Sequence, residues 1–258
     1  MDVSTVRERG AITLPLSRRE EYSAVIDDAF EFLRVKDLLS PFRKIIVKPN
    51  VVTSSPPPVT TDVECVRAVI AALEKRVESE ILVAEGSGCG DTLENMRKNG
   101  YSSLGVPLVD LDSVPFSVRR NGKAEVLKEV YLPDVLEGAA IVSVAPAKEH
   151  TITGVTLSLK NLIGCLPSEK YSGFWSFKKS KVHSLDTHRV IRDLALYLRP
   201  VVSVIDAREG LMGGHLSGRI PHPPIGRVVV GTDPVAADRE GCRLLGVNPD
   251  SIPHLRTC

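Results

Sequence analysis

The sequence predicts an α/β fold in which a mostly parallel β-sheet is flanked by helices and carries one small antiparallel hairpin. Three observations support this prediction. Short apolar runs typical of strands recur along the chain, amphipathic segments lie between them, and an Asn-Gly turn joins two further runs. Strands that are apolar on both faces indicate a sheet that helices cover on both sides.

Five apolar runs are predicted to be the strands of the sheet. They lack the strict alternation of apolar and polar residues that marks a half-exposed strand, which favours strands buried on both faces. In chain order they are KIIVK at 44–48, EILVAEG at 80–86, GAAIVSVAP at 138–146, VVSVIDA at 201–207 and RVVVGTD at 227–233.

Five segments with apolar residues three and four positions apart are predicted to be helices. They alternate with the strands, as the crossovers of a parallel, Rossmann-like sheet require. Thr61 or Asp62 precedes one of them and Asp233 another, and these residue types are typical helix caps. The segments span 20–39, 62–76, 92–98, 184–198 and 234–245.

The segment 115–131 departs from this alternation, because FSVRR, an Asn-Gly turn and AEVLKEVYL form the pattern of a β-hairpin. We expect an antiparallel edge or flap there. No repeat and no linker rich in Ser, Gly or charge divides the chain. Residues 1–258 are therefore expected to form a single α/β unit, or two closely packed lobes divided near 146–150 or near 200.

The composition narrows the classes of function. The 258 residues, 43% of them hydrophobic, suffice for a large core, and 33 Lys and Arg against 32 Asp and Glu leave a formal net charge of +1. No overall field therefore favours nucleic acid or an anionic membrane. Residues 1–22 lack the apolar run of a signal peptide, and no run approaches the roughly 20 apolar residues that cross a bilayer. We expect a cytoplasmic protein with no nucleic-acid or membrane partner.

The cysteines are scattered without C-x-x-C spacing, which argues against a disulfide framework and against a zinc or iron-sulfur motif. We expect most of them to be buried as small apolar residues. Cys89, in a glycine-rich loop, is the candidate for a reactive thiol. The five are Cys65, Cys89, Cys165, Cys242 and Cys258.

Polar residues stand at the carboxyl ends of the predicted strands, where open α/β sheets bind their ligands. We expect Lys48 and Asn50, after the first strand, to bind a phosphate or carboxylate, since a capped helix follows. The alternative is an ordinary crossover loop. After the second strand, a glycine-rich loop is expected to cradle an anion, or else to be a plain tight turn. It contains Gly86, Ser87 and Gly88, but neither the dinucleotide nor the Walker pattern.

Lys160 is the only formally charged residue in the apolar and small segment 150–167. Burying an ammonium costs several kcal/mol unless it is paired. This lysine therefore needs a carboxylate partner, a bound anion, or a lowered pKa that suits nucleophilic or Schiff-base chemistry. The alternative is a lysine whose long side chain reaches solvent. Asn161, also among apolar residues, favours a site, and we predict a catalytic role for both.

Histidines frame this segment. His150 opens it directly after a strand, and His183 precedes the helix 184–198, so each is a candidate acid-base group or metal ligand, with helix capping as the alternative. Asp206 is predicted to orient one histidine, or to complete a mixed nitrogen and oxygen site for a divalent metal. The glycine-rich loop 208–218 is the pattern of a flap that places His215 at the cleft edge, or of a surface loop.

Four segments of the chain form a recognisable pattern: IIVKPN at 45–50, HTITGVTLSLKNLIGCLP at 150–167, VIDAREGLMGG at 204–214 and VVGTDPVAADREGCRLLG at 230–246. In these segments the chain resembles the family known as domain of unknown function 362. Many members carry a ferredoxin-like segment with four cysteines, and this chain has none, so the resemblance implies no built-in iron-sulfur cluster here.

This family is distantly similar to the lactate racemase superfamily, whose members hold a nickel-pincer nucleotide through a lysine. The similarity implies that Lys160 corresponds to the lysine that bears the cofactor, His150 to a catalytic histidine and His183 to a metal-binding histidine. Lactate racemases carry more histidines at the site and a further domain.

The sequence therefore supports two main hypotheses about function. The first is an enzyme acting on a small anionic metabolite, with Lys48, Asn50 and Lys160 holding the anion and His150 and His183 as acid-base groups or ligands of nickel or another divalent metal. The second is a non-catalytic accessory protein that binds an anion, a metal or a cofactor. A third hypothesis is electron transfer alongside a separate ferredoxin.

Overall fold

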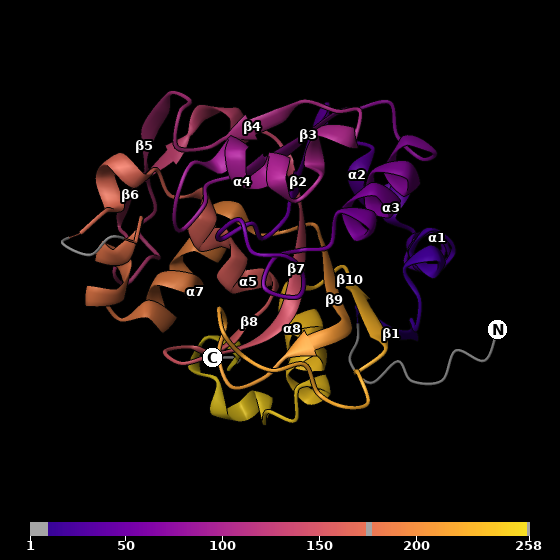
Figure 1. Ribbon diagram of the computed structural model, residues 1–258. Coiled ribbons are helices and arrows are strands. Elements are labelled where there is room, and N and C mark those ends of the chain that lie inside the picture. The colour runs from indigo at the N-terminus through magenta and orange to yellow at the C-terminus, as the bar shows by residue number, and fades with distance from the viewer. Residues whose placement is uncertain (1–9, 174–176, 257–258) are drawn as a thin grey trace.

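The computed structural model describes residues 10–173 and 177–256, and within them an eight-stranded sheet forms the centre of the fold (Figure 1). Seven strands follow the order β1-β10-β9-β7-β2-β3-β4, and β8 pairs with β7. The strands are β1 (Ala11–Pro15), β2 (Lys44–Lys48), β3 (Glu80–Glu85), β4 (Leu108–Asp110), β7 (Ala140–His150), β8 (Gly154–Thr156), β9 (Val202–Leu211) and β10 (Arg227–Gly231).

The middle of the sheet is parallel and one edge is antiparallel. The strands β9, β7, β2, β3 and β4 pair in parallel, whereas β10 pairs antiparallel with both β9 and β1. The chain between β9 and β10 contains no helix, so β10 returns beside β9 in the opposite direction. The predicted mostly parallel α/β sheet is confirmed, but the strict alternation of strand and helix fails at this edge. The short strands β1, β4 and β8 were not predicted.

The five predicted helical segments are present, one of them divided, and two further short helices at 158–161 and 168–171 were not predicted. The segment 20–39 forms two helices because Arg34 takes a left-handed conformation with φ 52°. Asp62 and Asp233 cap their helices, as predicted, by accepting backbone N–H bonds from Glu64 and Ala236. The α-helices are α1 (Tyr22–Phe32), α2 (Val35–Leu39), α3 (Val63–Glu74), α4 (Thr92–Lys98), α5 (Ser158–Asn161), α6 (Ser168–Tyr171), α7 (Thr187–Leu198) and α8 (Pro234–Leu244).

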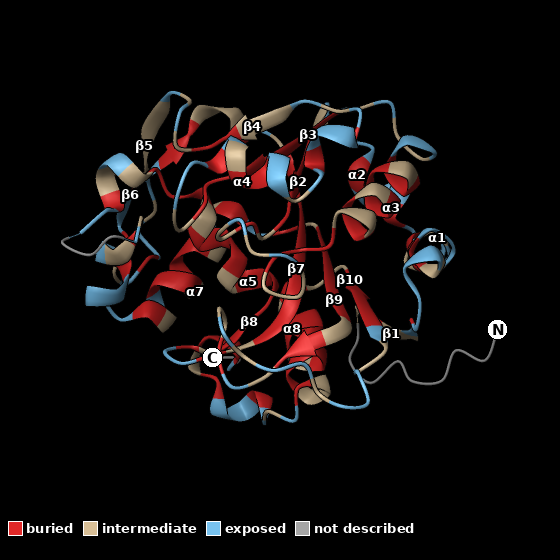
Figure 2. Ribbon diagram, in the orientation of Figure 1, coloured by how far each residue is buried: buried red, intermediate tan, exposed pale blue. Residues whose placement is uncertain are grey.

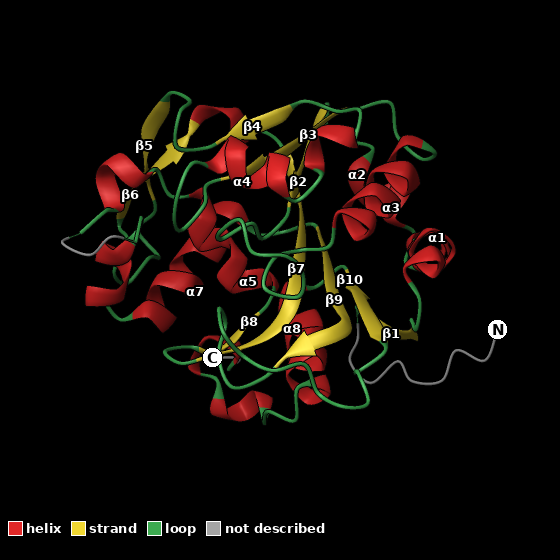
Figure 3. Cartoon of the chain, in the orientation of Figure 1, coloured by secondary structure: helices red, strands yellow, loops and turns green. Residues whose placement is uncertain are grey.

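Short 3₁₀ helices join several of these elements (Figure 3). One of them, η5, carries His183 into the site described below. They are η1 (Arg19–Glu21), η2 (Tyr101–Ser103), η3 (Asp134–Leu136), η4 (Leu162–Cys165), η5 (Ser180–Ser184), η6 (Pro249–Ser251) and η7 (Pro253–Leu255).

The predicted hairpin is present as β5 (Phe116–Arg120) and β6 (Glu129–Pro133), which pair antiparallel in a separate small sheet. Its connection is longer than the two-residue turn that the Asn-Gly pair suggested. Asp193 of α7 accepts hydrogen bonds from the backbone N–H groups of Glu125, Val126 and Leu127 at 2.7–2.9 Å. This tertiary contact stabilises the wider loop, and no local turn signal predicts it.

Each face of the main sheet packs against its own apolar core (Figure 2). Successive residues of a strand point to opposite faces, so Ile45 and Val47 of β2 belong to the core that contains α1 and α3. Ile46 belongs to the other core, beneath α7 and α8. Two-sided burial explains why the strands read as continuous apolar runs. Within residues 10–173 and 177–256, no helix is long and apolar enough to cross a membrane.

Candidate functional site

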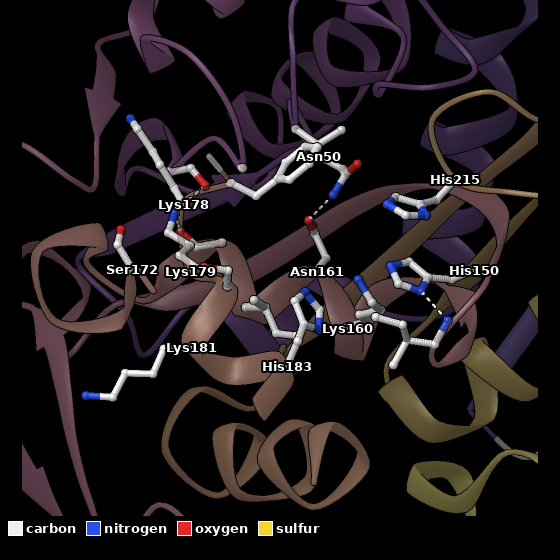
Figure 4. A pocket seen from close by; sticks show the side chains of 18 of the residues that line it. Asn50, His150, Lys160, Asn161, Ser172, Lys178, Lys179, Lys181, His183 and His215 are labelled. Atoms are coloured by element: carbon white, nitrogen blue, oxygen red, sulfur yellow. Dashed lines mark hydrogen bonds between the residues drawn. The ribbon is translucent and has the colours of Figure 1, made fainter. Parts of the chain in front are cut away.

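A cavity of about 1050 Å³ opens where β2, β3, β7 and β9 are followed by loops or short helices. Its walls come from segments far apart in the sequence, which Figure 4 shows from close by. Lysines gather at one end of the cavity, histidines and Lys160 at the other, and two asparagines lie between them (Figure 4). Of the residues predicted for the site, the lining includes Asn50, Gly86, Gly88, His150, Lys160, Asn161 and His183.

Three imidazoles converge at the histidine end. The rings of His150 and His215 stack with centroids 3.9 Å apart and an angle of 19° between their planes. His183 lies on the other side of His150, with ring centroids 6.4 Å apart. The three residues come from the end of β7, from η5 and from the loop after β9, so only the tertiary fold brings them together. His215 is at the cleft edge, where the flap hypothesis placed it.

The hydrogen bonds of His150 define its protonation state. The backbone N–H groups of Ile152 and Thr153 donate to Nδ1 at 3.1 and 3.4 Å. Since Nδ1 accepts, the proton of the neutral ring resides on Nε2. Burial, and then the charge of Lys160, lower the pKa of His150 far below its ordinary value. His150 therefore stays neutral and presents an N–H donor on its Nε2 side.

The other two rings are also neutral at pH 7. Burial lowers the pKa of His215 to about 4, with Lys160 and Lys148 contributing, and lowers the pKa of His183 together with Lys160. Neutral imidazoles can both accept and donate a proton, which suits acid-base chemistry near neutrality.

Lys160 projects among these rings from the short helix α5, with its amine near His150 and His183 (Figure 4). Burial lowers the pKa of Lys160 to about 8. In the part of the chain that the structure describes, no carboxylate pairs with this amine and no hydrogen-bond acceptor contacts it. Lys160 is half-buried on the cavity wall, so the alternative of a lysine whose side chain reaches solvent stays a prediction.

Asp238 of α8 holds the backbone that carries Lys160. Its carboxylate accepts the N–H groups of Ser158 and Leu159 at 2.8 and 3.0 Å, and burial raises the pKa of Asp238 to about 7. The sequence analysis missed this residue, which lies in the segment of the family resemblance at 230–246. Ala236 and Ala237 precede it but Arg239 and Glu240 follow it, so no local pattern distinguishes Asp238 from its charged neighbours.

Lys48 lies below the cavity floor and does not reach the cavity. It is fully buried, and its Nζ donates to Glu85 Oε1 at 2.6 Å, to the Pro49 carbonyl at 2.9 Å and to Asn161 Oδ1 at 3.3 Å. All three protons of this ammonium therefore have protein acceptors. The predicted anion-binding role does not fit this geometry, because the strand end turns the side chain inward towards Glu85.

The two asparagines link this buried ion pair to the cavity wall. Asn161 Nδ2 donates to the Lys48 carbonyl at 2.9 Å, and Asn161 Oδ1 accepts from Asn50 Nδ2 at 3.1 Å. Asn50 Oδ1 in turn accepts from Lys148 Nζ at 2.8 Å. Both amide groups are thus engaged within the protein, and the catalytic role of Asn161 and the anion-binding role of Asn50 stay predictions.

Lys148 is a second buried lysine behind the histidines. Besides Asn50, its Nζ donates to the Val59 carbonyl at 2.6 Å. Burial, followed by repulsion from Lys160, lowers the pKa of Lys148 to about 7. The sequence marks it only as a polar residue near the end of a strand. Its charge adds to the positive character of this end of the cavity.

Asp206 is not at the site. The strand β9 continues to Leu211, so Asp206 lies within a strand, and its Oδ1 accepts the backbone N–H of Arg208 at 3.0 Å. It lies beside Tyr22 and Asp62, and burial raises its pKa to about 6. No histidine contacts it within residues 10–173 and 177–256, so its predicted role in orienting a histidine does not fit.

The glycine-rich loop after β3 serves close packing. A Cβ at Gly86 would lie 2.3 Å from Lys179 Nζ and 2.6 Å from the Gly164 carbonyl, so only glycine fits. Lys179 donates to the Gly86 carbonyl, and Ser87 Oγ donates to the Val51 carbonyl at 2.6 Å. These bonds tie the loop to the protein. Ser87 is absent from the cavity lining. Gly86 and Gly88 form part of the cavity wall, but no contact indicates that their backbone N–H groups donate to a ligand.

The lysine end of the cavity is partly neutralised. Asp112 pairs with Lys178 at 3.3 Å and with Lys179 at 3.4 Å. Lys181 is exposed at this end. Net positive charge thus remains at both ends of the cavity.

The residues present do not fit a metal ion. In the described residues, no group of three or more His, Cys, Asp or Glu side chains could hold one. His150 Nδ1 accepts two backbone N–H groups, which leaves a proton and not a lone pair on Nε2. The metal-ligand roles predicted for His150 and His183 are therefore not supported by this geometry.

The cysteines follow the prediction where they can be compared. Cys65, Cys165 and Cys242 are buried free thiols, and Cys89 is half-buried. Cys258 lies outside the described residues.

The sequence and the fold are similar to those of known proteins. The profile of the family "Domain of unknown function (DUF362)" matches residues 45–243. The chain is 23% identical over 234 residues to a thylakoid-associated protein of Synechocystis sp., covering 85% of this chain and 68% of that protein. A crystal structure of a protein from Thermotoga maritima matches 90% of this chain with a TM-score of 0.50 and 14% identity. The chain spans 60% of that structure's length, and the likeness concerns the fold alone.

Proposed function

The chain belongs to the DUF362 family, and on that premise we propose that it is an enzyme acting on a small anionic metabolite bound beside Lys160. One observation carries the proposal: the Lys160 amine opens into the cavity among three imidazoles, and no carboxylate of the described chain pairs with it. Lys160 is half-buried, and an ammonium that is partly removed from water is stabilised by a counter-charge. A bound anion supplies it.

The charges of the surrounding residues support an anionic ligand. Glu85 is a carboxylate on the lining, and it is committed to Lys48 and to the backbone N–H of Val51. Asp112 is likewise committed to two lysines. The acidic groups nearest the cavity are thus already paired, whereas Lys160 is not.

The imidazoles support catalysis over simple binding. A site that only held an anion would gain most from charged donors, yet the pKa values of all three histidines are lowered, so they are neutral at pH 7. Neutral imidazoles within reach of one amine are suited to moving protons on a bound substrate. The similarity to lactate racemases stays a prediction, and no step of this proposal depends on a metal.

Ligand-induced stabilisation tests the proposal. Pyruvate, oxalate and inorganic phosphate are titrated separately while the thermal unfolding midpoint is recorded for the wild type and for Lys160→Met. A ligand at one hundred times its Kd stabilises the folded state by about 2.7 kcal/mol. We expect at least one of these anions to raise the midpoint of the wild type and to lose its effect on Lys160→Met.

Lys123→Met is the matched control, because it removes one positive charge from the exposed hairpin loop away from the cavity. It should respond to the anion as the wild type does. Equal responses of all three proteins would mean that Lys160 does not hold the anion, and the proposal would fall. Under the accessory-protein hypothesis, Lys160→Met would lose retention of the anion with no turnover to lose.

A further inference from the structure

We propose that Lys160 forms a Schiff base with the carbonyl carbon of an α-keto acid. This inference rests on the proposed function and gives the substrate class: a carboxylate for the histidine end of the cavity, where Lys148 adds positive charge, next to a carbonyl group for the Lys160 amine.

The contrast among four lysines around the cavity singles out Lys160, which is half-buried, whereas Lys48, Lys148 and Lys179 are buried. The amines of Lys48, Lys148 and Lys179 each donate to two or more protein acceptors. Lys160 alone among these four has no acceptor in residues 10–173 and 177–256. An engaged amine is a structural cation, whereas an amine without partners in a partly closed cavity is free to attack a carbonyl carbon.

The backbone around Lys160 limits where the amine can point. The carboxylate of Asp238 anchors the first two residues of α5 through two N–H bonds, and Asn161 is tied to Lys48 and Asn50 on the opposite side. The residue between these anchors has a fixed Cα position. A fixed backbone position lowers the entropy that the lysine side chain loses when its amine is oriented for reaction.

His150 supplies the group that a carbonyl oxygen requires. Its Nδ1 is held as an acceptor by two backbone N–H groups, so its Nε2–H is the donor on the cavity side. A neutral imidazole that donates to a carbonyl oxygen polarises the carbonyl without needing to ionise. His215 stacks on the other face of this ring and keeps its orientation.

The step balances without any further reactant. The nitrogen lone pair forms the N–C bond as the carbonyl electron pair moves to oxygen, which gives a carbinolamine after one proton passes from nitrogen to oxygen. Loss of that oxygen as water forms the C=N bond. Counted from the ammonium, two of its three protons leave in the water and the iminium keeps the third. His183, on the other side of the amine in Figure 4, carries these protons as a neutral imidazole.

The remaining lining indicates the rest of the substrate. Ile152, Ile163 and Leu216 line the same cavity as Lys160, and Ile152 is 53% exposed as a residue. An α-keto acid with a short apolar side chain would cover this surface. Pyruvate, whose side chain is a methyl group, is the smallest such probe.

Reductive trapping tests the inference. The full chain is incubated with pyruvate and sodium cyanoborohydride at pH 7, and its intact mass and peptide map are measured. We expect a mass gain of one reduced pyruvate, located on Lys160. Surface lysines, which are protonated at this pH, react poorly with a ketone. Lys181→Met, which removes an exposed amine of the same cavity, should be labelled like the wild type.

Lys160→Arg separates the Schiff base from anion binding, because arginine keeps the positive charge but forms no such adduct. It should bind pyruvate by titration calorimetry and acquire no label. Lactate, which has the carboxylate but no carbonyl group, should bind the wild type and leave no adduct.

The possible failures are distinguishable. If the wild type binds pyruvate and lactate but is not labelled, or if Lys160→Arg is labelled equally, the Schiff base is overturned and the proposed anion-binding function stands. If neither acid binds nor labels the wild type, the Schiff base with α-keto acids is overturned and the proposed function loses its carboxylate ligand as well.

Discussion

Two neighbouring regions of the molecule, around Lys48 and around Lys160, give their lysine opposite surroundings. Around Lys48, every ammonium proton meets an acceptor, and Glu85 supplies the opposite charge at 2.6 Å. Around Lys160, one residue from the asparagine that contacts Lys48, the described chain supplies three neutral rings and no acceptor. The difference teaches that burial alone does not mark a functional lysine. The absence of an internal partner is the feature that sets Lys160 apart, and it is the basis of the proposed anion site.

Lys48→Met should cause the largest loss of stability. Removing one partner of a buried ion pair leaves Glu85 charged and unpaired, which costs about 3–5 kcal/mol. Urea unfolding measures this change. The double variant Lys48→Met with Glu85→Gln should recover part of the loss. Lys160→Met should lose less than about 1 kcal/mol, since no partner is left behind. Equal losses for the two single lysine variants would erase the contrast between the regions.

Asp238→Asn should cause the next largest loss. An amide offers one oxygen where the carboxylate accepts two backbone N–H groups, so one buried N–H loses its partner at a cost of about 1–3 kcal/mol. The free energy of unfolding reports this cost. In addition, the rate of adduct formation at Lys160 should fall while pyruvate still binds. An unchanged labelling rate would mean that Asp238 stabilises α5 without positioning the amine.

The pH dependence of stability should differ between the wild type and Lys160→Met. The pKa of Lys160 is about 8 in the folded protein, against an ordinary value of 10.5. Between these values the unfolded chain binds more protons, so the free energy of unfolding rises with pH. Lys148, with a pKa of about 7, adds a rise in the same direction. Urea titrations from pH 7 to 10.5 should give a smaller rise for Lys160→Met, and identical slopes would contradict a lowered pKa.

His183→Gln should have the smallest effect on stability, within about 0.5 kcal/mol, because the imidazole is exposed to the cavity and makes no hydrogen bond in the described chain. Its effect should appear in kinetics. Loss of a positioned proton carrier slows a step by about 10²–10⁴ fold. Single-turnover trapping should therefore be slower at an unchanged affinity for pyruvate. A variant that labels as fast as the wild type would remove His183 from the proposed step.

Much of the fold was predictable because local patterns report it directly. Two-sided apolar runs indicated five strands, and Asp62 and Asp233 marked two helix starts. Other features were not predicted. The wide hairpin loop depends on Asp193 of α7, and the antiparallel return of β10 follows from a connection after β9 that contains no helix.

The sequence alone identified Lys160 as a candidate site residue, because burying one charge in an apolar segment costs free energy that a binding partner must offset. It also placed His150 and His183 on the flanks of that segment. The tertiary structure decided which side chains are paired. It pairs Lys48 with Glu85, places Asp206 beside Tyr22, and stacks His215 on His150. The physical reason is that hydrogen-bond satisfaction depends on side-chain direction and distance between strands, neither of which a linear pattern contains.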